Sequence, residues 1–235
     1  YSGVDALDGS TTNTDAATPF PAGTFTTEGG GDVVEVPEEP AVELGICGAD
    51  ATLISAIQGS ESSSAEVGNN VIIEAIVTGT RAGGFFVQEE ASDYDADDAT
   101  SEGLFVEGSV DVETGNLVRF YGEVEENYGM TTLAMDSDVA ALDCGTADAV
   151  AAVELSMPYE LDLETVEGMV VSVTDATVTS TNNLWRFGEI VVSDTIKRQP
   201  SDVAAPLSEA YTAAEEASEI SLLTIEDNSS SQYPD

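Results

Sequence analysis

An acidic loop between two strand-like segments carries the residues with the clearest capacity for chemistry. In "GGFFVQEEASDYDADDATSEGLFVE", residues 83–107, three aspartates alternate at Asp93, Asp95 and Asp97, and Glu102 follows them. Calcium-binding loops place side-chain oxygens on one ion with similar spacing. The pattern therefore suggests a calcium site built from these four carboxylates and nearby backbone carbonyls.

The loop differs from the EF-hand, the best-known calcium-binding loop. An EF-hand has glycine at its sixth position and glutamate at its twelfth. Counted from Asp93, these positions hold Asp98 and Leu104. Two interpretations stay open: a looser calcium site, and a solvated acidic loop on a very acidic chain.

Histidine is absent from the sequence. Imidazole is the usual general base and the commonest neutral metal ligand, so a Ser-His-Asp triad, a Cys-His pair and a His-rich zinc site are excluded. Metal chemistry must then use oxygen ligands, which favours hard cations such as calcium or magnesium. Because no nucleophile and base can be paired, we expect no catalytic residue and no enzyme activity in this chain.

Two cysteines bracket the most strand-like part of the chain. Cys47 and Cys144 are each followed by glycine, in "ICGAD" and "DCGTA". In an oxidising compartment such a pair predicts one disulfide. Closing a loop of about 100 residues would stabilise the fold by about 4–5 kcal/mol in the chain-entropy model. Two unpaired, small hydrophobic side chains are the alternative.

The charge balance is extreme. The 235 residues include 46 acidic and 5 basic side chains, a formal net charge of -41 at pH 7. Such a chain repels phosphate backbones, because nucleic-acid binding depends on lysine and arginine. Its surface fits a saline or divalent-rich exterior, as in marine or halophilic organisms, since cations screen self-repulsion. A soluble acidic protein from any other habitat is the alternative.

The cysteine pair and the hydropathy pattern indicate a secreted, extracellular protein. No apolar run approaches the roughly 20 residues that span a bilayer, so we expect no membrane partner. Tyr1 opens directly into polar sequence without a signal peptide. We therefore expect the chain to be a mature or excised piece of a secreted protein.

Changes in composition divide the chain into four regions. Residues 1–45 are rich in Ser, Thr, Gly and Pro, which is typical of an extended low-complexity arm or linker. Residues 46–147 contain five short alternating segments separated by turn signals, which predicts a mainly β fold with an OB-fold-like five-stranded barrel. Residues 148–228 repeat a related pattern incompletely, which predicts a second, partial OB-like β domain with one short helix. Residues 229–235 are typical of a linker.

Local signals refine two parts of this prediction. The fifth strand of the barrel is expected over residues 130–144, with a bend at residues 136–138. In the second β domain, strands are expected around an "STNN" turn and at "GEIVVSD", and "LSEAYTAAEEASE" predicts the helix, with Ser208 as its N-cap.

The only tryptophan, Trp185, is followed by Arg186. Both residue types are enriched at binding hot spots, so an exposed Trp-Arg pair indicates a partner contact. The alternative is a tryptophan that covers the end of the second β domain.

OB barrels often bind single-stranded nucleic acid through a basic groove and exposed aromatic side chains. In residues 46–147, however, the basic residues are only Arg81 and Arg119. We expect nucleic-acid binding by this chain to be absent. The aromatic candidates are Phe85, Phe86, Phe105, Phe120, Tyr121 and Tyr128, of which Phe85 and Phe105 are expected in the core and Tyr128 in a turn.

Several segments occur in the order found in a known family. Within roughly residues 47–228 they are "LISAIQGS", "VIIEAIVTG", "GGFFVQEE", "DADDATSEGLFVE", "GNLVRFYGEVEENYGMTTL", "LETVEGMVVSV" and "LWRFGEIVVS". In this order they resemble the OB-fold region of bacterial secreted nucleases whose catalytic domain belongs to the endonuclease/exonuclease/phosphatase superfamily. In that family the nuclease domain lies further toward the C-terminus and uses histidines, so no catalytic residue transfers to this chain. The resemblance implies a non-catalytic accessory module.

Two functions stay open, because a complete enzyme lacks the necessary groups. The first is an accessory or scaffolding module of a secreted nuclease, with the catalytic domain of its parent protein as partner. The second is an extracellular structural protein of a filament, sheath or matrix, with other copies of itself as partners. The N-terminal arm would then add as a strand to a neighbouring sheet. Calcium is the one cofactor expected in either case.

Overall fold

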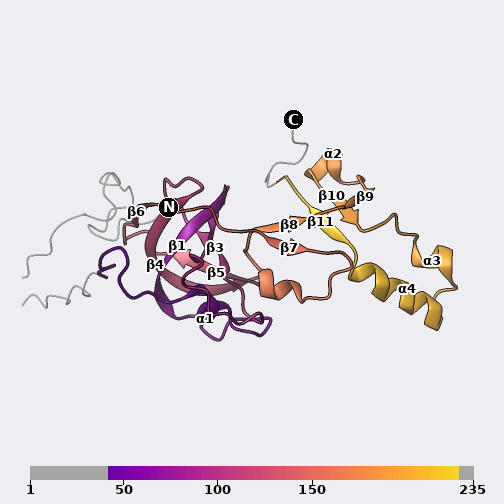
Figure 1. Cartoon of the computed structure of the whole chain (residues 1–235), viewed down its shortest axis with the longest axis horizontal. Coiled ribbons are helices and arrows are strands. Elements are labelled where there is room, and N and C mark those ends of the chain that lie inside the picture. The colour runs from indigo at the N-terminus through magenta and orange to yellow at the C-terminus, as the bar shows by residue number, and fades with distance from the viewer. Residues whose placement is uncertain (1–41, 228–235) are drawn as a thin grey trace, which may run out of the picture. The chain divides into compact units, whose positions relative to one another are not determined.

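The computed structural model describes residues 42–227, which belong to one structural unit (Figure 1). Most of the predicted N-terminal arm, residues 1–45, lies outside the described residues. The predicted C-terminal linker, residues 229–235, lies outside them as well.

Five strands close into a β-barrel. They are β1 (Asn70–Arg81), β2 (Gly84–Gln88), β3 (Gly103–Glu107), β4 (Asn116–Asn127) and β5 (Met130–Met135). The strand order is β1-β2-β3-β5-β4, and β4 also pairs with β1, which closes the barrel. β3 and β5 run parallel, whereas the other neighbours are antiparallel. The predicted OB-like five-stranded barrel is confirmed.

The length of β1 lets it pair with two neighbours. Residues 70–76 pair with β4, and residues 76–81 pair with β2. The register shifts between Val77 and Gly79, where a bulge bends the strand and increases its twist. Side chains at every second position belong to the buried core, as the alternation predicts: Val71, Ile73, Ala75 and Val77.

A short helix and aromatic packing complete the core of the barrel. α1 (Ile54–Gln58) precedes β1 and contributes Ile54 and Ile57, both fully buried. Phe85 of β2 and Phe120 of β4 meet edge to face, with ring centroids 5.7 Å apart. This geometry is the one that aromatic pairs prefer.

The single strand predicted for residues 130–144 is two strands in the structure. β5 ends at Met135, and β6 (Leu142–Thr146) pairs with the beginning of β4. Between them, Asp136 Oδ1 accepts a hydrogen bond from the Asp138 amide at 2.8 Å, a side-chain turn typical of aspartate. The predicted bend is therefore present, but it ends β5, which pairs with residues 122–127 of β4, and directs the chain to residues 116–119 of the same strand.

Residues 148–227 contain two small sheets. β7 and β8 pair in parallel, and β9, β10 and β11 form an antiparallel sheet with β10 in the middle. In chain order these strands are β7 (Val153–Leu155), β8 (Val171–Val173), β9 (Thr177–Ser180), β10 (Ile190–Ser193) and β11 (Leu223–Ile225). The mainly β character predicted for the chain is confirmed.

The predicted helix is α4 (Glu209–Glu219). Ser208 Oγ caps it by accepting a hydrogen bond from the Tyr211 amide at 3.2 Å. The N-cap predicted from the sequence is therefore confirmed, and it satisfies an amide that has no partner within the helix.

Within residues 148–227 the structure adds three short helical segments that were not predicted: η1 (Leu163–Val166), α2 (Leu184–Phe187) and α3 (Pro200–Val203). α2 follows the predicted "STNN" turn and ends at Gly188, whose φ of 72° is typical of a helix C-terminus. No helix within residues 42–227 has both the length and the hydropathy that crossing a bilayer requires.

Candidate functional site

A disulfide joins the chain that enters the barrel to the strand that follows it. Cys47 precedes α1, Cys144 lies in β6, and their Cα atoms are 5.6 Å apart. The bond spans a sequence separation of 97 residues, which includes every strand of the barrel. The predicted cysteine pairing is therefore confirmed.

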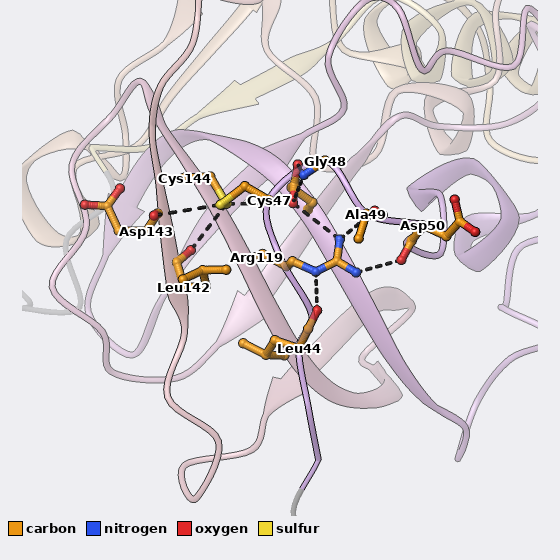
Figure 2. A network of polar contacts seen from close by, with 10 residues as sticks. Leu44, Cys47, Gly48, Ala49, Asp50, Arg119, Leu142, Asp143 and Cys144 are labelled. Carbon is orange, nitrogen blue, oxygen red and sulfur yellow. Dashed lines mark hydrogen bonds and ion pairs between the residues drawn. A yellow bond between two sulfur atoms is a disulfide. The ribbon is translucent and has the colours of Figure 1, made fainter.

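Arg119 of β4 organises the polar contacts beside this disulfide (Figure 2). Its side chain is 2% exposed and forms an ion pair with Glu74, with 3.3 Å between Nη1 and Oε2. A buried charge is tolerated when it is paired and hydrogen-bonded. The guanidinium meets this condition by donating to three backbone carbonyls, those of Leu44 at 2.5 Å, Ala49 at 2.9 Å and Asp50 at 2.6 Å.

The disulfide region also contains the one set of three potential metal ligands that lie within 4.8 Å of one another among the described residues. The set is Cys47, Glu74 and Cys144. The two sulfurs are bonded to each other, so neither can act as the thiolate that a metal requires. Glu74 is paired with Arg119 and accepts a hydrogen bond from the Gly48 amide at 2.9 Å. This cluster therefore stabilises the fold.

Both arginines of the barrel make contacts within the protein. Arg119 is buried, and the guanidinium carbon of Arg81 lies 5.0 Å from the centroid of the Phe105 ring, within cation–π range. Phe85 and Phe105 are buried, as predicted, and Tyr128 is exposed between β4 and β5. Neither arginine belongs to a basic groove of the kind that follows a nucleic-acid backbone.

The alternating aspartates of the acidic loop make local turns. Asp95 Oδ1 accepts a hydrogen bond from the Asp97 amide at 2.8 Å, and Asp97 Oδ1 accepts one from the Ala99 amide at 3.0 Å. The Thr100 hydroxyl donates to Asp95 Oδ2 at 3.0 Å. Asp93, Asp95 and Asp97 are all exposed. The alternation therefore has a local structural cause, because aspartate favours such turns.

Of the four predicted calcium ligands, the structure brings Asp95 and Glu102 together. Glu102 is 5% exposed, and its Oε1 accepts a hydrogen bond from the Asp95 amide at 3.1 Å. Burial is the main cause that raises the pKa of Glu102, and the charge of the neighbouring Asp95 raises it further. Glu102 Oε2 is buried without a hydrogen-bond partner. Asp93 and Asp97 do not join this pair, because no three carboxylates of the described residues lie within 4.8 Å of one another.

Glu89, which the sequence did not single out, is buried beside this pair. The residue is 1% exposed, and Oε1 accepts a hydrogen bond from the Ile54 amide at 2.7 Å. Burial raises the pKa of Glu89 to about 8, with smaller contributions from the charges of Asp93 and Glu102. Glu89 therefore holds a proton at neutral pH. The period of a β-strand is the signal that could have found it, because Glu89 follows the buried Val87 by two residues.

A cavity of about 410 Å³ adjoins Glu102. One side consists of acidic-loop residues and the other of apolar side chains that follow the barrel in the sequence. The lining includes Tyr94, Asp97, Asp98, Glu102, Leu161 and Met169. A space of this size with several polar groups is suited to hold water.

Residues 163–170, here called the docking segment, are attached to the barrel by hydrogen bonds. The Glu167 carbonyl accepts from the Ser101 hydroxyl at 2.6 Å, and Glu167 Oε1 accepts from the Thr131 amide at 2.9 Å. The Val170 amide donates to Gln88 Oε1 at 2.9 Å. The segment thus contacts the ends of β2, β3 and β5.

Two glycines allow the docking segment to approach β3 closely. A Cβ on Gly103 would lie 2.4 Å from backbone atoms of Gly168 and Met169, and a Cβ on Gly168 would lie 2.7 Å from the Leu104 amide nitrogen. Gly168 also has a φ of 70°, which disfavours other residues. This contact depends on glycine at both positions, and no periodicity in the sequence reveals it.

Trp185 and Arg186 lie in α2. Trp185 is 77% exposed, so it does not serve as a cover over the second β region. The guanidinium carbon of Arg186 lies 4.8 Å from the centroid of the Phe187 ring. The exposed pair is compatible with a binding hot spot, and its role as a partner contact stays a prediction.

A comparison with protein-family models found no match, and a comparison with curated proteins found none either. The class of protein is therefore defined by its fold and contacts: an OB-like β-barrel whose flanking segments are joined by a disulfide, with a docked segment after it.

Proposed function

We propose that the chain is a non-catalytic accessory module of a secreted nuclease, in which the barrel acts as a base for the polypeptide that follows it. The observation that carries this proposal is the attachment of the docking segment to the barrel. Glu167 supplies both a backbone carbonyl and a side-chain oxygen to that attachment.

The attachment restricts the position of the docking segment. Three barrel residues provide hydrogen-bonding groups for it, namely Gln88, Ser101 and Thr131. Each hydrogen bond contributes about 1 kcal/mol. Together, the three bonds favour the attached state over the detached state by a factor of roughly a hundred in population. The close contact of Gly103 with Gly168 adds packing to this preference. A scaffold requires such a fixed connection.

The described groups support positioning rather than bond cleavage. Asp95 and Glu102 are two neighbouring carboxyl groups, without a nucleophile or a second base that has a separate role. Glu89 is buried against the Ile54 amide, and Arg119 is committed to the disulfide region. Catalytic residues of the proposed nuclease would therefore lie in another domain.

The link to nucleases comes from the order of the sequence segments that resemble the OB-fold region of that family. An OB-like barrel is the fold that this resemblance implies. The formal net charge of -41 disfavours direct contact with a phosphate backbone. We infer that the module supports a catalytic domain, which binds the nucleic acid itself.

An antibody raised against the folded chain tests the proposal on the native protein. The antibody recovers that protein from the culture medium of the source organism, and the recovered material is assayed for DNA and RNA hydrolysis with magnesium or calcium. Pre-immune serum is the matched control. We expect nuclease activity, with peptides that continue beyond Asp235 into a histidine-containing domain. Recovery of a protein without either would contradict the proposal.

A second candidate function is an extracellular structural protein that self-assembles by strand addition. One observation favours it: among the described residues, β9 and β11 each pair on one side only, and such edges can accept another strand. Most of the expected donor, residues 1–45, lies outside the described residues. Sedimentation velocity in calcium and salt separates the two candidates. A monomer at every concentration supports the accessory module, and large polymers support the assembly.

A further inference from the structure

One buried carboxylate oxygen beside the acidic loop has no partner. Glu102 is 5% exposed, and its Oε1 accepts a hydrogen bond from the Asp95 amide. The second oxygen, Oε2, has no hydrogen-bond donor. A buried polar atom without a partner is costly and rare, so an unfilled position on a carboxylate indicates a missing ligand.

While both groups are ionised, the neighbouring carboxylate has no hydrogen to donate to this oxygen. The Asp95 carboxylate adjoins Glu102, because the Asp95 amide donates to Glu102 Oε1 at 3.1 Å. It also accepts hydrogen bonds from the Asp97 amide at 2.8 Å and the Thr100 hydroxyl at 3.0 Å, and such bonds favour its charged form. Two neighbouring ionised carboxylates repel each other. A positive charge between them would satisfy both.

We propose that Asp95 and Glu102 bind one calcium ion, with Glu102 Oε2 as a ligand and water from the adjoining cavity completing the coordination. Calcium accepts about 6–8 oxygen ligands in variable geometry, whereas magnesium requires a near-ideal octahedron. The backbone amides and Thr100 orient both carboxylates, so they cannot adjust freely to an octahedron. The cavity of about 410 Å³ at Glu102 provides room for bound water.

This site is smaller than the site predicted from the sequence. Asp93 and Asp97 contribute negative charge nearby, which attracts a cation without coordinating it. Calcium affinity follows the number of charged ligands and the rigidity of the site. With two protein carboxylates we expect a dissociation constant on the order of 10⁻⁴–10⁻³ M. The inference goes beyond the proposed function, because it does not depend on a nuclease partner.

Calorimetric titration of the full chain with calcium chloride, after removal of metals with a chelator, tests the proposal. We expect saturable binding at one site. Glu102→Gln and Asp95→Asn keep the size of each side chain and remove its charge, and each should weaken binding at least about tenfold. Asp136→Asn is the matched control, because Asp136 makes the same kind of side-chain turn, with the Asp138 amide at 2.8 Å. It should bind as the wild type does.

Three outcomes would overturn the proposal. The first is no calcium binding by the wild type at millimolar concentration. The second is equal weakening by Asp136→Asn and by the two site variants, which would mean that calcium only screens the surface. The third is unchanged calcium binding in Asp95→Asn. Asp95 is exposed, so this variant should fold normally even if the buried substitution Glu102→Gln disturbs the fold. A rise in stability of Glu102→Gln without calcium binding in the wild type would identify a shared proton instead.

Discussion

Glu89 and Glu102 face each other just beyond the paired ends of β2 and β3, where the Glu89 amide donates to the Glu102 carbonyl at 3.0 Å. They are 1% and 5% exposed. Like charges at opposed positions of a β-pair are destabilising, so this arrangement requires that one residue be neutral. Glu89 meets the requirement, because burial raises its pKa to about 8.

Stability should therefore fall as the pH rises through neutrality. The pKa of Glu89 is about 8 in the folded protein and 4.5 for the ordinary side chain, so between these values the folded state holds the extra proton. The stabilisation is fully present below pH 4.5 and is lost as the pH passes 8. The difference is on the order of 5 kcal/mol. Thermal melts between about pH 5 and about pH 9, with a chelator present, measure it.

Glu89→Gln should remove most of this pH dependence. Glutamine keeps an oxygen that can accept the Ile54 amide hydrogen bond, but it does not ionise. Glu123→Gln, an exposed position of β4, is the matched control and should leave the slope unchanged. If the stability of Glu89→Gln depended on pH as steeply as that of the wild type, another titratable group would be the cause of the pH dependence.

Arg119→Ala should destabilise the fold by about 3–5 kcal/mol, because it leaves Glu74 and three carbonyls without their buried partner. Urea unfolding with the disulfide intact measures this loss. Arg186→Ala in α2 is the control and should change stability by no more than about 0.5 kcal/mol. Similar effects of the two substitutions would contradict the role assigned to the Arg119 network.

The barrel was predictable because its signals are local. Alternation in β1 and β4 and the glycine-rich turns depend on nearby residue types. The cysteine pairing is distant in sequence, but two cysteines allow only one intramolecular disulfide. The division of residues 130–144 into β5 and β6 was missed for the opposite reason. Where the chain pairs after a bend is decided by tertiary packing: β5 pairs with the end of β4, and β6 returns to its beginning.

The candidate site was predictable only in part. Glu102 and Asp95 stand out by their place in the acidic loop, whereas Glu89 is one of 46 acidic side chains and only the period of the preceding strand marks it. Its burial follows from the register of β2 against β3. The docking segment escaped prediction because it depends on contact between Gly103 and Gly168, which are distant in the sequence.

The charge of the chain predicts a steep salt dependence of the melting temperature. With a formal net charge of -41, compaction brings like charges together, and mobile cations relieve the repulsion. The melting temperature should rise from low-salt buffer to seawater-like ionic strength. Calcium should raise the melting temperature at far lower concentration than sodium does. Glu102→Gln should remove the additional rise caused by calcium and keep the rise caused by sodium.

Thermal melts across sodium chloride, repeated with millimolar calcium and with magnesium, measure this dependence. A flat response to sodium chloride would show that the charges are already dispersed or neutralised. An equal rise in melting temperature with calcium and with magnesium would mean that both ions only screen the surface charge. It would contradict a calcium site at Asp95 and Glu102.

Hydrogen exchange of the docking segment, followed by mass spectrometry in the full chain, tests most directly whether the barrel holds the polypeptide that follows it. Peptides covering residues 163–170 should exchange about as slowly as those of β3. Gly168→Ala should speed exchange in the docking segment at least about tenfold and leave β1 and β4 unchanged. Gly115→Ala is the control, since Gly115 has a φ of 93° but no atom within 4 Å of an added Cβ. In this variant the docking segment should exchange as slowly as in the wild type. Exchange of residues 163–170 in the wild type as fast as in an unfolded peptide would contradict the account.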